Sequence, residues 1–272
     1  MTAEHEKLKA QQYVNSSKFN ARIHLHATYS TNIYPWPCWV WDQIEATDHA
    51  KVLELGGGNG LLWMANAPRI PPHWDITVTD FSPGMLEDAR LNLSSVNPHI
   101  QYAVVDAMHI PYLDETFDIV IANHMLYHVK DRKQALSEIR RVLKQDGTFY
   151  ATTVGSSNML EMKQLVTAFD PNSRYEQVLE SITSNFSLDN GAEQLHAWFQ
   201  DVQCQRYEDA LVVTDADALV EYVLSCNGLE TGQMVLDPRQ VDSFRDYINH
   251  HMKQGGGKIE IRKDSGIFIS RS

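Results

Sequence analysis

The period of the hydrophobic positions changes near residue 50. From Lys51 to Thr153, short apolar runs alternate with stretches in which apolar residues recur every three or four positions. Short runs between turn residues predict buried strands, and the longer period predicts amphipathic helices. The predicted strands are residues 51–55, 76–79, 101–105, 118–122 and 148–153. Strands that alternate with helices predict an α/β fold, a mostly parallel sheet with helices on both faces.

Two of the intervening helices have clear boundary signals. Ser82 can cap a helix that has Pro83 at its first position. The apolar residues that follow it at helical spacing are Met85, Ala89, Leu93 and Val96. A second stripe predicts a helix that ends at Asp146-Gly147. Its apolar members are Ala135, Leu136, Ile139, Val142 and Leu143.

The alternation stops after Thr153, which predicts excursions from the sheet. Residues 155–190 are expected to form a polar loop and helices, residues 191–200 a short amphipathic helix, and residues 202–213 a strand. Thr214 can cap a further helix. The last residues alternate again around a turn at Asp264-Ser265-Gly266, which predicts an antiparallel final strand. We therefore expect an N-terminal helical cap segment (1–48) and a core (49–272), with lid-like helical excursions at about 155–190 and 214–256.

A glycine-rich turn follows the first predicted strand. The sequence runs VLELGGGNG, with Glu54 ahead of glycines at positions 56, 57, 58 and 60. Glycines allow a tight turn and a close approach of ligand to backbone, and a helix N-terminus presents free N–H groups. The dinucleotide pattern G-x-G-x-x-G requires glycine at position 61 or 63, where Leu61 and Trp63 stand. This mismatch disfavours an NAD-dependent dehydrogenase, and an ordinary strand-to-helix turn stays an alternative.

Acidic residues end the next two predicted strands. Asp80 closes ITVTD and can accept hydrogen bonds from ribose hydroxyls, or it can simply support the turn before the capped helix. Asp106 closes YAVVD. Ligands of open α/β sheets lie beyond the carboxyl ends of the strands, so both residues are expected at one crevice with the glycine turn.

These motifs together resemble class I, Rossmann-like methyltransferases that use S-adenosylmethionine, in the small-molecule branch related to quinone-biosynthesis methyltransferases. The likeness covers about residues 50–153 and includes FDIVIANHMLYHVKD. It implies S-adenosylmethionine as cofactor and S-adenosylhomocysteine as product. It also implies that Asp106 faces the adenine amino group and that the Asn123 backbone faces the cofactor's amino end. The implied cofactor-binding residues are Glu54, Gly56, Gly57, Gly58, Asp80, Phe81, Met85, Asp106, Ala107, Met108, Asn123, His124 and Met125.

His124 is the candidate general base if the acceptor must lose a proton, because imidazole titrates near neutral pH. The alternative is that it only lines the pocket or bonds to a neighbour. His128 lies four residues on and could share a helical face with His124, but no third ligand stands nearby, so no metal site is expected. The candidate residues lining the substrate site are Tyr29, Trp36 and His128. Tyr29 and Trp36 belong to an aromatic cluster that either contacts the sulfonium or a cationic substrate through ring faces or packs an N-terminal helix.

The acidic composition bears on the partner. Lys and Arg number 23 against 35 Asp and Glu, which gives a net charge of −12 and disfavours phosphate backbones. Enzymes that methylate the exocyclic amines of nucleic-acid bases usually carry Asn/Asp-Pro-Pro-Tyr after the fourth strand, where this chain has Asn123-His124-Met125-Leu126. Cytosine-C5 methyltransferases need a Pro-Cys nucleophile after the same strand, whereas Pro37-Cys38 of this chain precedes the cofactor turn. We therefore expect a small-molecule acceptor and no nucleic acid. A non-catalytic cofactor-binding protein is the alternative from another class.

Three separated cysteines, a polar N-terminus and the lack of a long apolar run predict a soluble, cytoplasmic protein with no disulfide framework and no membrane contact. The sequence does not predict an oligomeric state.

Overall fold

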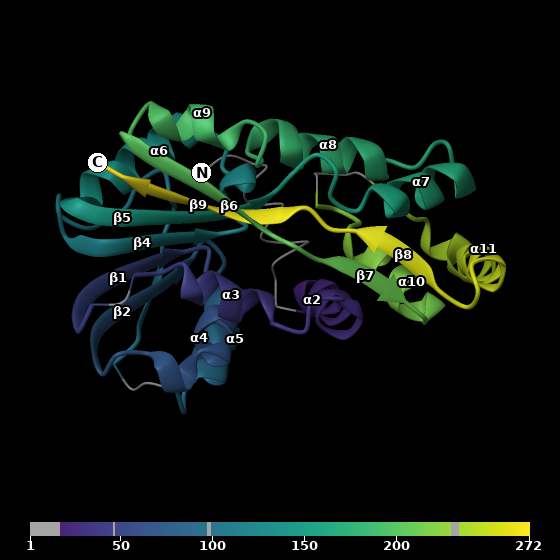
Figure 1. The fold of residues 1–272 in the computed structure, drawn as a ribbon, viewed down its shortest axis with the longest axis horizontal. Helices are drawn as coiled ribbons and strands as arrows, with labels where there is room; N and C mark the ends of the chain where they lie inside the picture. Colours follow the sequence, from purple (N-terminus) through teal and green to yellow (C-terminus); the bar gives the residue numbers. More distant parts are fainter. Residues whose placement is uncertain (1–16, 46, 97–98, 230–233) are drawn as a thin grey trace. The chain divides into compact units, whose positions relative to one another are not determined.

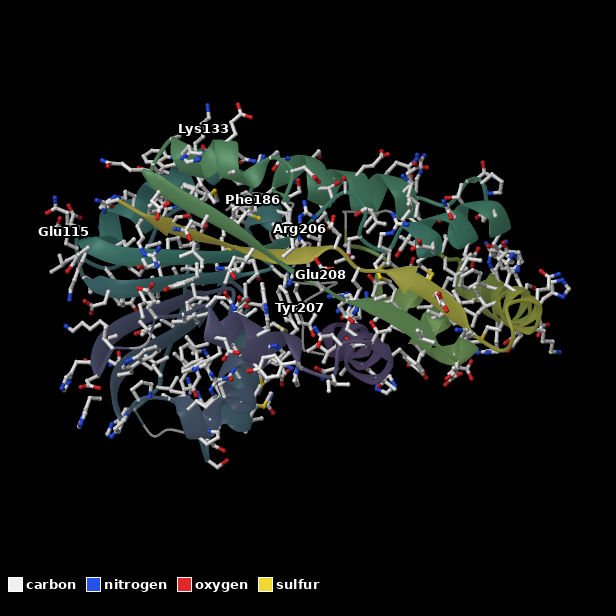
Figure 2. All side chains as sticks on the ribbon, viewed as in Figure 1. Glu115, Lys133, Phe186, Arg206, Tyr207 and Glu208 are labelled. Atoms are coloured by element: carbon white, nitrogen blue, oxygen red, sulfur yellow. The ribbon has the colours of Figure 1, made fainter. Side chains whose placement is uncertain are left out.

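The structure is a computed structural model that describes residues 17–45, 47–96, 99–229 and 234–272. The chain divides into two compact units. Of the described residues, those within 34–156, 182–207 and 265–272 form the sheet unit, and those within 17–33, 157–181 and 208–264 form the helical unit. Figure 2 labels Tyr207 and Glu208, between which the chain passes from the sheet unit to the helical unit. The domain boundary expected at residue 48 stays a prediction.

A mostly parallel sheet forms the centre of the sheet unit. In the part of the chain that the structure describes it has seven strands, in the spatial order β3-β2-β1-β4-β5-β9-β6. Their bounds are β1 His49–Leu55, β2 His73–Asp80, β3 Gln101–Val104, β4 Phe117–Asn123, β5 Leu143–Val154, β6 Asp201–Tyr207 and β9 Ser265–Arg271. The first five are parallel, and β9 runs antiparallel to both β5 and β6. The predicted α/β fold with an antiparallel final strand is confirmed.

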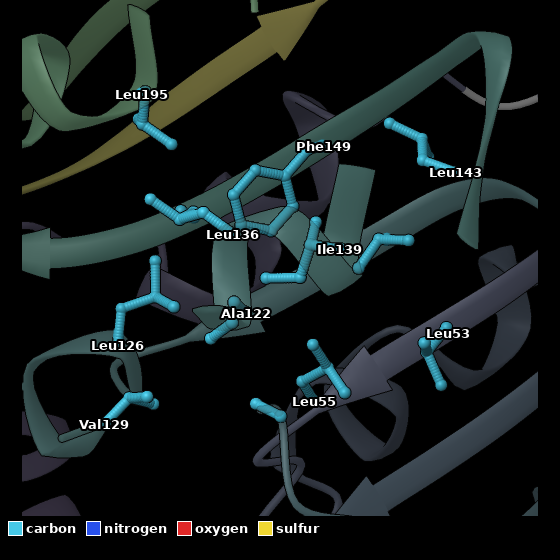
Figure 3. Close-up of a cluster of buried hydrophobic side chains, with 14 of the residues drawn as sticks. Leu53, Leu55, Ala122, Leu126, Val129, Leu136, Ile139, Leu143, Phe149 and Leu195 are labelled. Carbon is cyan, nitrogen blue, oxygen red and sulfur yellow. The ribbon is translucent and has the colours of Figure 1, made fainter. Parts of the chain in front are cut away.

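Helices cover both faces of this sheet (Figure 1). One face carries α6 (Arg132–Val142) and α9 (Gly191–His196), whose apolar side chains pack on alternate residues of the strands, among them Leu53 and Phe149 (Figure 3). The other face carries α3 (Trp36–Asp42), α4 (Leu61–Ala65) and α5 (Pro83–Leu93). Because side chains alternate across a strand, Val52 and Leu53 enter different cores.

The cap predicted for α5 is confirmed, since the Ser82 hydroxyl accepts a hydrogen bond from the Met85 N–H. The end predicted for α6 is wrong. The helix stops at Val142, and Leu143 already begins β5, so Asp146 and Gly147 lie within the strand. Gly147 is needed there, because a Cβ would lie 2.9 Å from the Asp118 carbonyl oxygen. The apolar stripe continues into the strand, so it gives no mark of the boundary.

The helical unit has its own core. Its strands β7 (Ala210–Val213) and β8 (Ile259–Arg262) form an antiparallel pair. The helices around them are α2 Ser17–Tyr29, α7 Leu160–Phe169, the start of α8 Tyr175–Asn185, α10 Ala216–Ser225 and α11 Val241–Gln254. Buried Asp209 accepts from the Ser30 hydroxyl at 2.6 Å and pairs with Lys263 at 2.6 Å. The expected lid role of the excursions stays a prediction.

Several local predictions in the second half of the chain need correction. Residues 202–213 form two strands in different sheets, β6 and β7, rather than one. The cap of α10 is Asp215 and not Thr214, because the Asp215 carboxylate accepts from the Asp217 N–H. Ser265 and Gly266 begin β9 instead of forming a turn, and Gly266 pairs with both Thr153 and Arg206. Pairing between distant strands overrides the local turn signal.

The described helices include none that is both long and apolar enough to cross a lipid bilayer.

Candidate functional site

The glycine turn lies where the strand order reverses, since β1 has β2 on one side and β4 on the other. Gly56 has a φ of +67°, a left-handed conformation that favours glycine. A Cβ at Gly56 would lie 2.7 Å from the Cβ of Met125. The turn therefore brings the end of β1 against the segment after β4, and the sheet edge between them is the place where open α/β sheets bind ligands.

Gly57 is required by packing. Its N–H donates to the Thr79 carbonyl at 2.8 Å, which ties the turn to β2. A Cβ at this position would lie 2.6 Å from Val78 Cγ1 and 2.8 Å from a Glu54 carboxylate oxygen. Such distances are far below ordinary contact, so only glycine fits without a shift of its neighbours.

Glu54 is a buried carboxylate at the end of β1, with 1% of its surface exposed. One oxygen accepts from the Trp63 indole N–H, and the other accepts from the Asn123 side-chain amide at 3.0 Å. Burial raises the pKa of the Glu54 carboxyl from 4.5 to about 7, against the lowering effect of both donors, and the charge of Asp80 adds to the rise. Glu54 thus joins α4 and β4 beneath the turn.

Asp80 ends β2 beside the glycine turn. Its carboxylate accepts from the Gly58 N–H at 3.0 Å and from the Ser82 N–H at 2.8 Å. Burial raises the pKa of Asp80, while the backbone N–H groups of Ser82, Gly58 and Phe81 lower it. Met85, one turn into α5, is buried. Asp80 therefore supports the turn, which is one of the two roles expected for it. Its carboxylate oxygens retain lone pairs that can accept further hydrogen bonds, as the expected role toward ribose hydroxyls needs.

Asp106 follows β3, and the Val105 N–H donates to the Asp80 carbonyl at 3.1 Å, which holds the two strand ends together. The Asp106 carboxylate accepts from the Met108 N–H at 2.9 Å, and its other oxygen lies 3.8 Å from His109 Nδ1. Ala107 is buried and Met108 is half-buried, so apolar atoms flank the carboxylate.

Asn123 ends β4, and His124 follows it. The Asn123 side chain contacts Glu54 through its amide nitrogen, and its oxygen accepts from the Thr152 hydroxyl at 3.3 Å. His124 has a φ of +48°, and its N–H donates to the Thr152 hydroxyl at 3.0 Å. Its ring lies 5.4 Å from the Trp36 ring, between centroids. The residues predicted at the ends of β1, β2, β3 and β4 thus lie along one edge of the sheet.

The aromatic residues divide between the two units. Trp36 belongs to the sheet unit, where it packs with Trp39 at 5.3 Å and Tyr207 at 5.2 Å. Tyr29 belongs to the helical unit and packs on its core. A joint role of Tyr29 and Trp36 in binding an acceptor stays a prediction.

The proposed common helical face of His124 and His128 is wrong. His128 lies in a 3-10 turn, η2 (Leu126–His128), and His124 precedes it in a left-handed conformation. Within the described ranges, no group of three or more His, Cys, Asp or Glu side chains is placed to hold a metal ion.

Three side chains that build this region are not predicted from the sequence: Trp63, Thr152 and Tyr207. Of these, Trp63 carries a local signal, because a tryptophan in the helix that follows an acidic strand end can donate its indole N–H to that carboxylate. Thr152 is separated from His124 by helix α6 and most of β5, and Tyr207 lies further away along the chain. Only strand pairing brings them close.

Comparison with known proteins bears directly on this arrangement. Residues 53–151 match a family model described as a methyltransferase domain. The matched segment runs from β1 into β5 and therefore contains the glycine turn, Asp80, Asp106 and Asn123. Residues 53–151 are a class I methyltransferase domain of the S-adenosylmethionine-dependent type. The resemblance to the quinone-biosynthesis branch is confirmed by curated relatives.

The chain is 39% identical over 107 residues to a demethylmenaquinone methyltransferase of Lactobacillus johnsonii, a match that covers 39% of this chain and 43% of the relative. It is 34% identical over 119 residues to a malonyl-[acyl-carrier protein] O-methyltransferase of Geobacter sulfurreducens, with 44% of each chain covered. The chain thus spans less than half the length of these curated relatives.

Solved structures share the fold. A phosphoethanolamine N-methyltransferase 2 of Haemonchus contortus, in complex with S-adenosyl-L-methionine, has a TM-score of 0.61 and 18% identity, with 100% of this chain and 60% of that chain covered. The YcgJ protein of Bacillus subtilis has a TM-score of 0.58 and 18% identity, with 87% of this chain and 98% of that chain covered. At such identities the likeness concerns the architecture.

Proposed function

We propose that the chain binds S-adenosylmethionine at the edge of the sheet formed by β1 to β4 and transfers its methyl group to a small-molecule acceptor. The observation that carries this proposal is the position of Asp80 against the glycine turn, with Asp106 after the neighbouring strand and the ends of β2 and β3 joined by the bond from the Val105 N–H to the Asp80 carbonyl. In this arrangement the turn faces the methionine part of the cofactor. Asp80 accepts hydrogen bonds from the ribose hydroxyls, and Asp106 accepts one from the adenine amino group.

The donor set of the site fits this cofactor. Two carboxylates suit the hydroxyl and amino donors of the nucleoside. Apolar atoms of Ala107 and Met108 next to Asp106 suit a planar base. The main-chain groups of Gly56 to Gly58 and the buried Glu54 suit the polar, zwitterionic end of the methionine part. Phe81, Met85 and Met125 complete the proposed contacts.

When bound, the cofactor supplies an electrophilic methyl group on a good leaving group. The tasks left to the protein are to align the acceptor with that methyl and to exclude water. His124 and Met125 follow β4, next to the turn, and are the residues we propose on the acceptor side. His124 acts there as a base for an acceptor that must lose a proton, and as a wall of the pocket for one that need not.

The acceptor is a small molecule in this proposal. The names of two curated relatives state different acceptors, demethylmenaquinone and malonyl-[acyl-carrier protein], so they do not single out one acceptor for this chain. The net charge of −12 disfavours a nucleic acid.

Calorimetric titration tests the cofactor. We expect the purified protein to bind S-adenosylmethionine and S-adenosylhomocysteine and not NAD. Asp80→Asn is expected to weaken S-adenosylhomocysteine binding at least about tenfold, since hydrogen bonds to a charged group contribute about 1.5–3 kcal/mol. Asp75→Asn is the matched control, because Asp75 is an exposed residue of the same strand and should leave the affinity unchanged.

The outcomes separate the candidates. Binding of NAD but of neither sulfur compound would replace the proposal by a dehydrogenase. Equal losses in Asp80→Asn and Asp75→Asn would show that the ligand does not use the end of β2. Tight binding without methyl transfer to any of a panel of amines, phenols and carbon acids would favour a non-catalytic, cofactor-binding protein.

A further inference from the structure

A continuous set of hydrogen bonds links Glu54, in β1 just before the glycine turn, to His124. The Trp63 indole and the Asn123 amide nitrogen donate to the two oxygens of Glu54. The Asn123 oxygen accepts from the Thr152 hydroxyl at 3.3 Å, and that hydroxyl accepts from the His124 N–H at 3.0 Å. Each donor meets an acceptor, so the Asn123 amide and the Thr152 hydroxyl have one defined orientation each.

The last bond of this set acts on a residue with a left-handed backbone. His124 has a φ of +48°, a region that is uncommon for residues other than glycine, although histidine is enriched there together with asparagine and aspartate. Such a conformation persists only where the surroundings determine it strongly. The His124 N–H is shared between the Thr152 hydroxyl and the Thr152 carbonyl, at 3.0 and 3.2 Å. Thr152 therefore fixes the peptide group that sets the direction of the His124 side chain.

Aromatic contacts act separately on the ring. The His124 ring lies 5.4 Å from Trp36 and 6.4 Å from Tyr127, between centroids. Trp36 is itself packed by Trp39 and Tyr207 at 5.3 and 5.2 Å. The backbone of His124 is thus held by β5, and its ring by residues of other segments.

We propose that Thr152 is a positioning residue, whose hydroxyl couples the orientation of Glu54 and Asn123 to the left-handed backbone of His124. The catalytic use of this positioning rests on the proposed function, because His124 lies on the proposed acceptor side of the transferred methyl. The hydrogen bonds themselves join residues of the sheet unit only. Thr152 is 1% exposed and does not contact the acceptor in this proposal.

Thr152→Val tests the hydroxyl with little change of shape, and Thr152→Ser restores it. The matched control is Thr153→Val. Thr153 is equally buried and the next residue of β5, but its hydroxyl donates to the Phe186 carbonyl at 2.8 Å, away from His124. Figure 2 labels Phe186.

The readout is nuclear magnetic resonance of the ligand-free protein, with the His124 signals assigned by comparison with His124→Gln. In Thr152→Val we expect the His124 ring and amide signals to shift and the amide to exchange with solvent about fivefold faster, as loss of one hydrogen bond implies. Thr152→Ser should restore both. Thr153→Val should change thermal stability without moving the His124 signals.

Unchanged His124 signals in Thr152→Val would overturn the proposal. So would equal changes in Thr152→Val and Thr153→Val, which would indicate a general packing effect. Titration with S-adenosylhomocysteine is done in parallel on the same samples. Failure of the unmodified protein to bind it would refute the proposed function, while the His124 signals would still decide whether Thr152 positions this residue.

Discussion

Replacing Glu54 with glutamine is expected to flatten the pH dependence of the protein's stability between pH 4.5 and about 7, the ordinary and the folded-state pKa of this carboxyl. The unfolded chain releases the Glu54 proton near the lower value, and the folded protein keeps it until the higher one. The contribution to stability is therefore fully present below pH 4.5 and is lost as the pH rises toward 7. At about 1.4 kcal/mol per pH unit, the loss amounts to about 3 kcal/mol.

Urea unfolding of the ligand-free protein at pH values across this window measures the effect. Glu87→Gln is the control, since Glu87 is exposed on α5 and pairs only loosely with Arg90 at 4.0 Å. The comparison concerns the slope with pH, because glutamine offers one acceptor oxygen where Trp63 and Asn123 need two, and this loss lowers stability at every pH. A slope in Glu54→Gln equal to that of the unmodified protein would mean that Glu54 titrates normally.

Gly57→Ala is expected to destabilise the protein by about 1–3 kcal/mol, the usual cost of inserting a methyl group into a packed site. The reason is steric, since the new Cβ would meet Val78 Cγ1 at 2.6 Å and a Glu54 oxygen at 2.8 Å. The displaced turn should also weaken binding of S-adenosylhomocysteine. Thermal unfolding measures the loss of stability, and calorimetric titration measures the affinity for S-adenosylhomocysteine.

A double-mutant cycle with Val78→Ala isolates the steric cause. Val78→Ala removes the methyl group nearest to the new Cβ, so the double variant should be more stable than the sum of the single effects predicts. The rescue should be partial, because the contact with Glu54 remains. Additive effects would show that the cost of Gly57→Ala arises elsewhere in the turn.

The glycine turn illustrates how the interpretation changes with the structure. From the sequence, Gly57 is a position for close approach of a ligand. In the structure, the neighbours that exclude a side chain at Gly57 are Val78 and Glu54. Gly57 thus shapes the cofactor turn through packing, whatever it contacts in a bound complex.

The sequence by itself determined the features that depend on nearby residues. The five parallel strands, the Ser82 cap of α5 and the turn at the end of β1 all arise from apolar runs, from a side chain that reaches three residues along, or from glycine's own backbone freedom. The resemblance to methyltransferases follows from the same local motifs, and residues 53–151 confirm it.

Only the tertiary structure decided the features that depend on pairing between distant segments. Leu143 begins β5 because it pairs with Phe117 of β4, and residues 202–213 divide because β6 and β7 have different partners, β9 and β8. Likewise Glu54 finds Trp63 and Asn123, and His124 takes its left-handed form against Thr152. Propensity and periodicity describe a residue's neighbours along the chain, whereas these contacts join strand ends that only the sheet brings together.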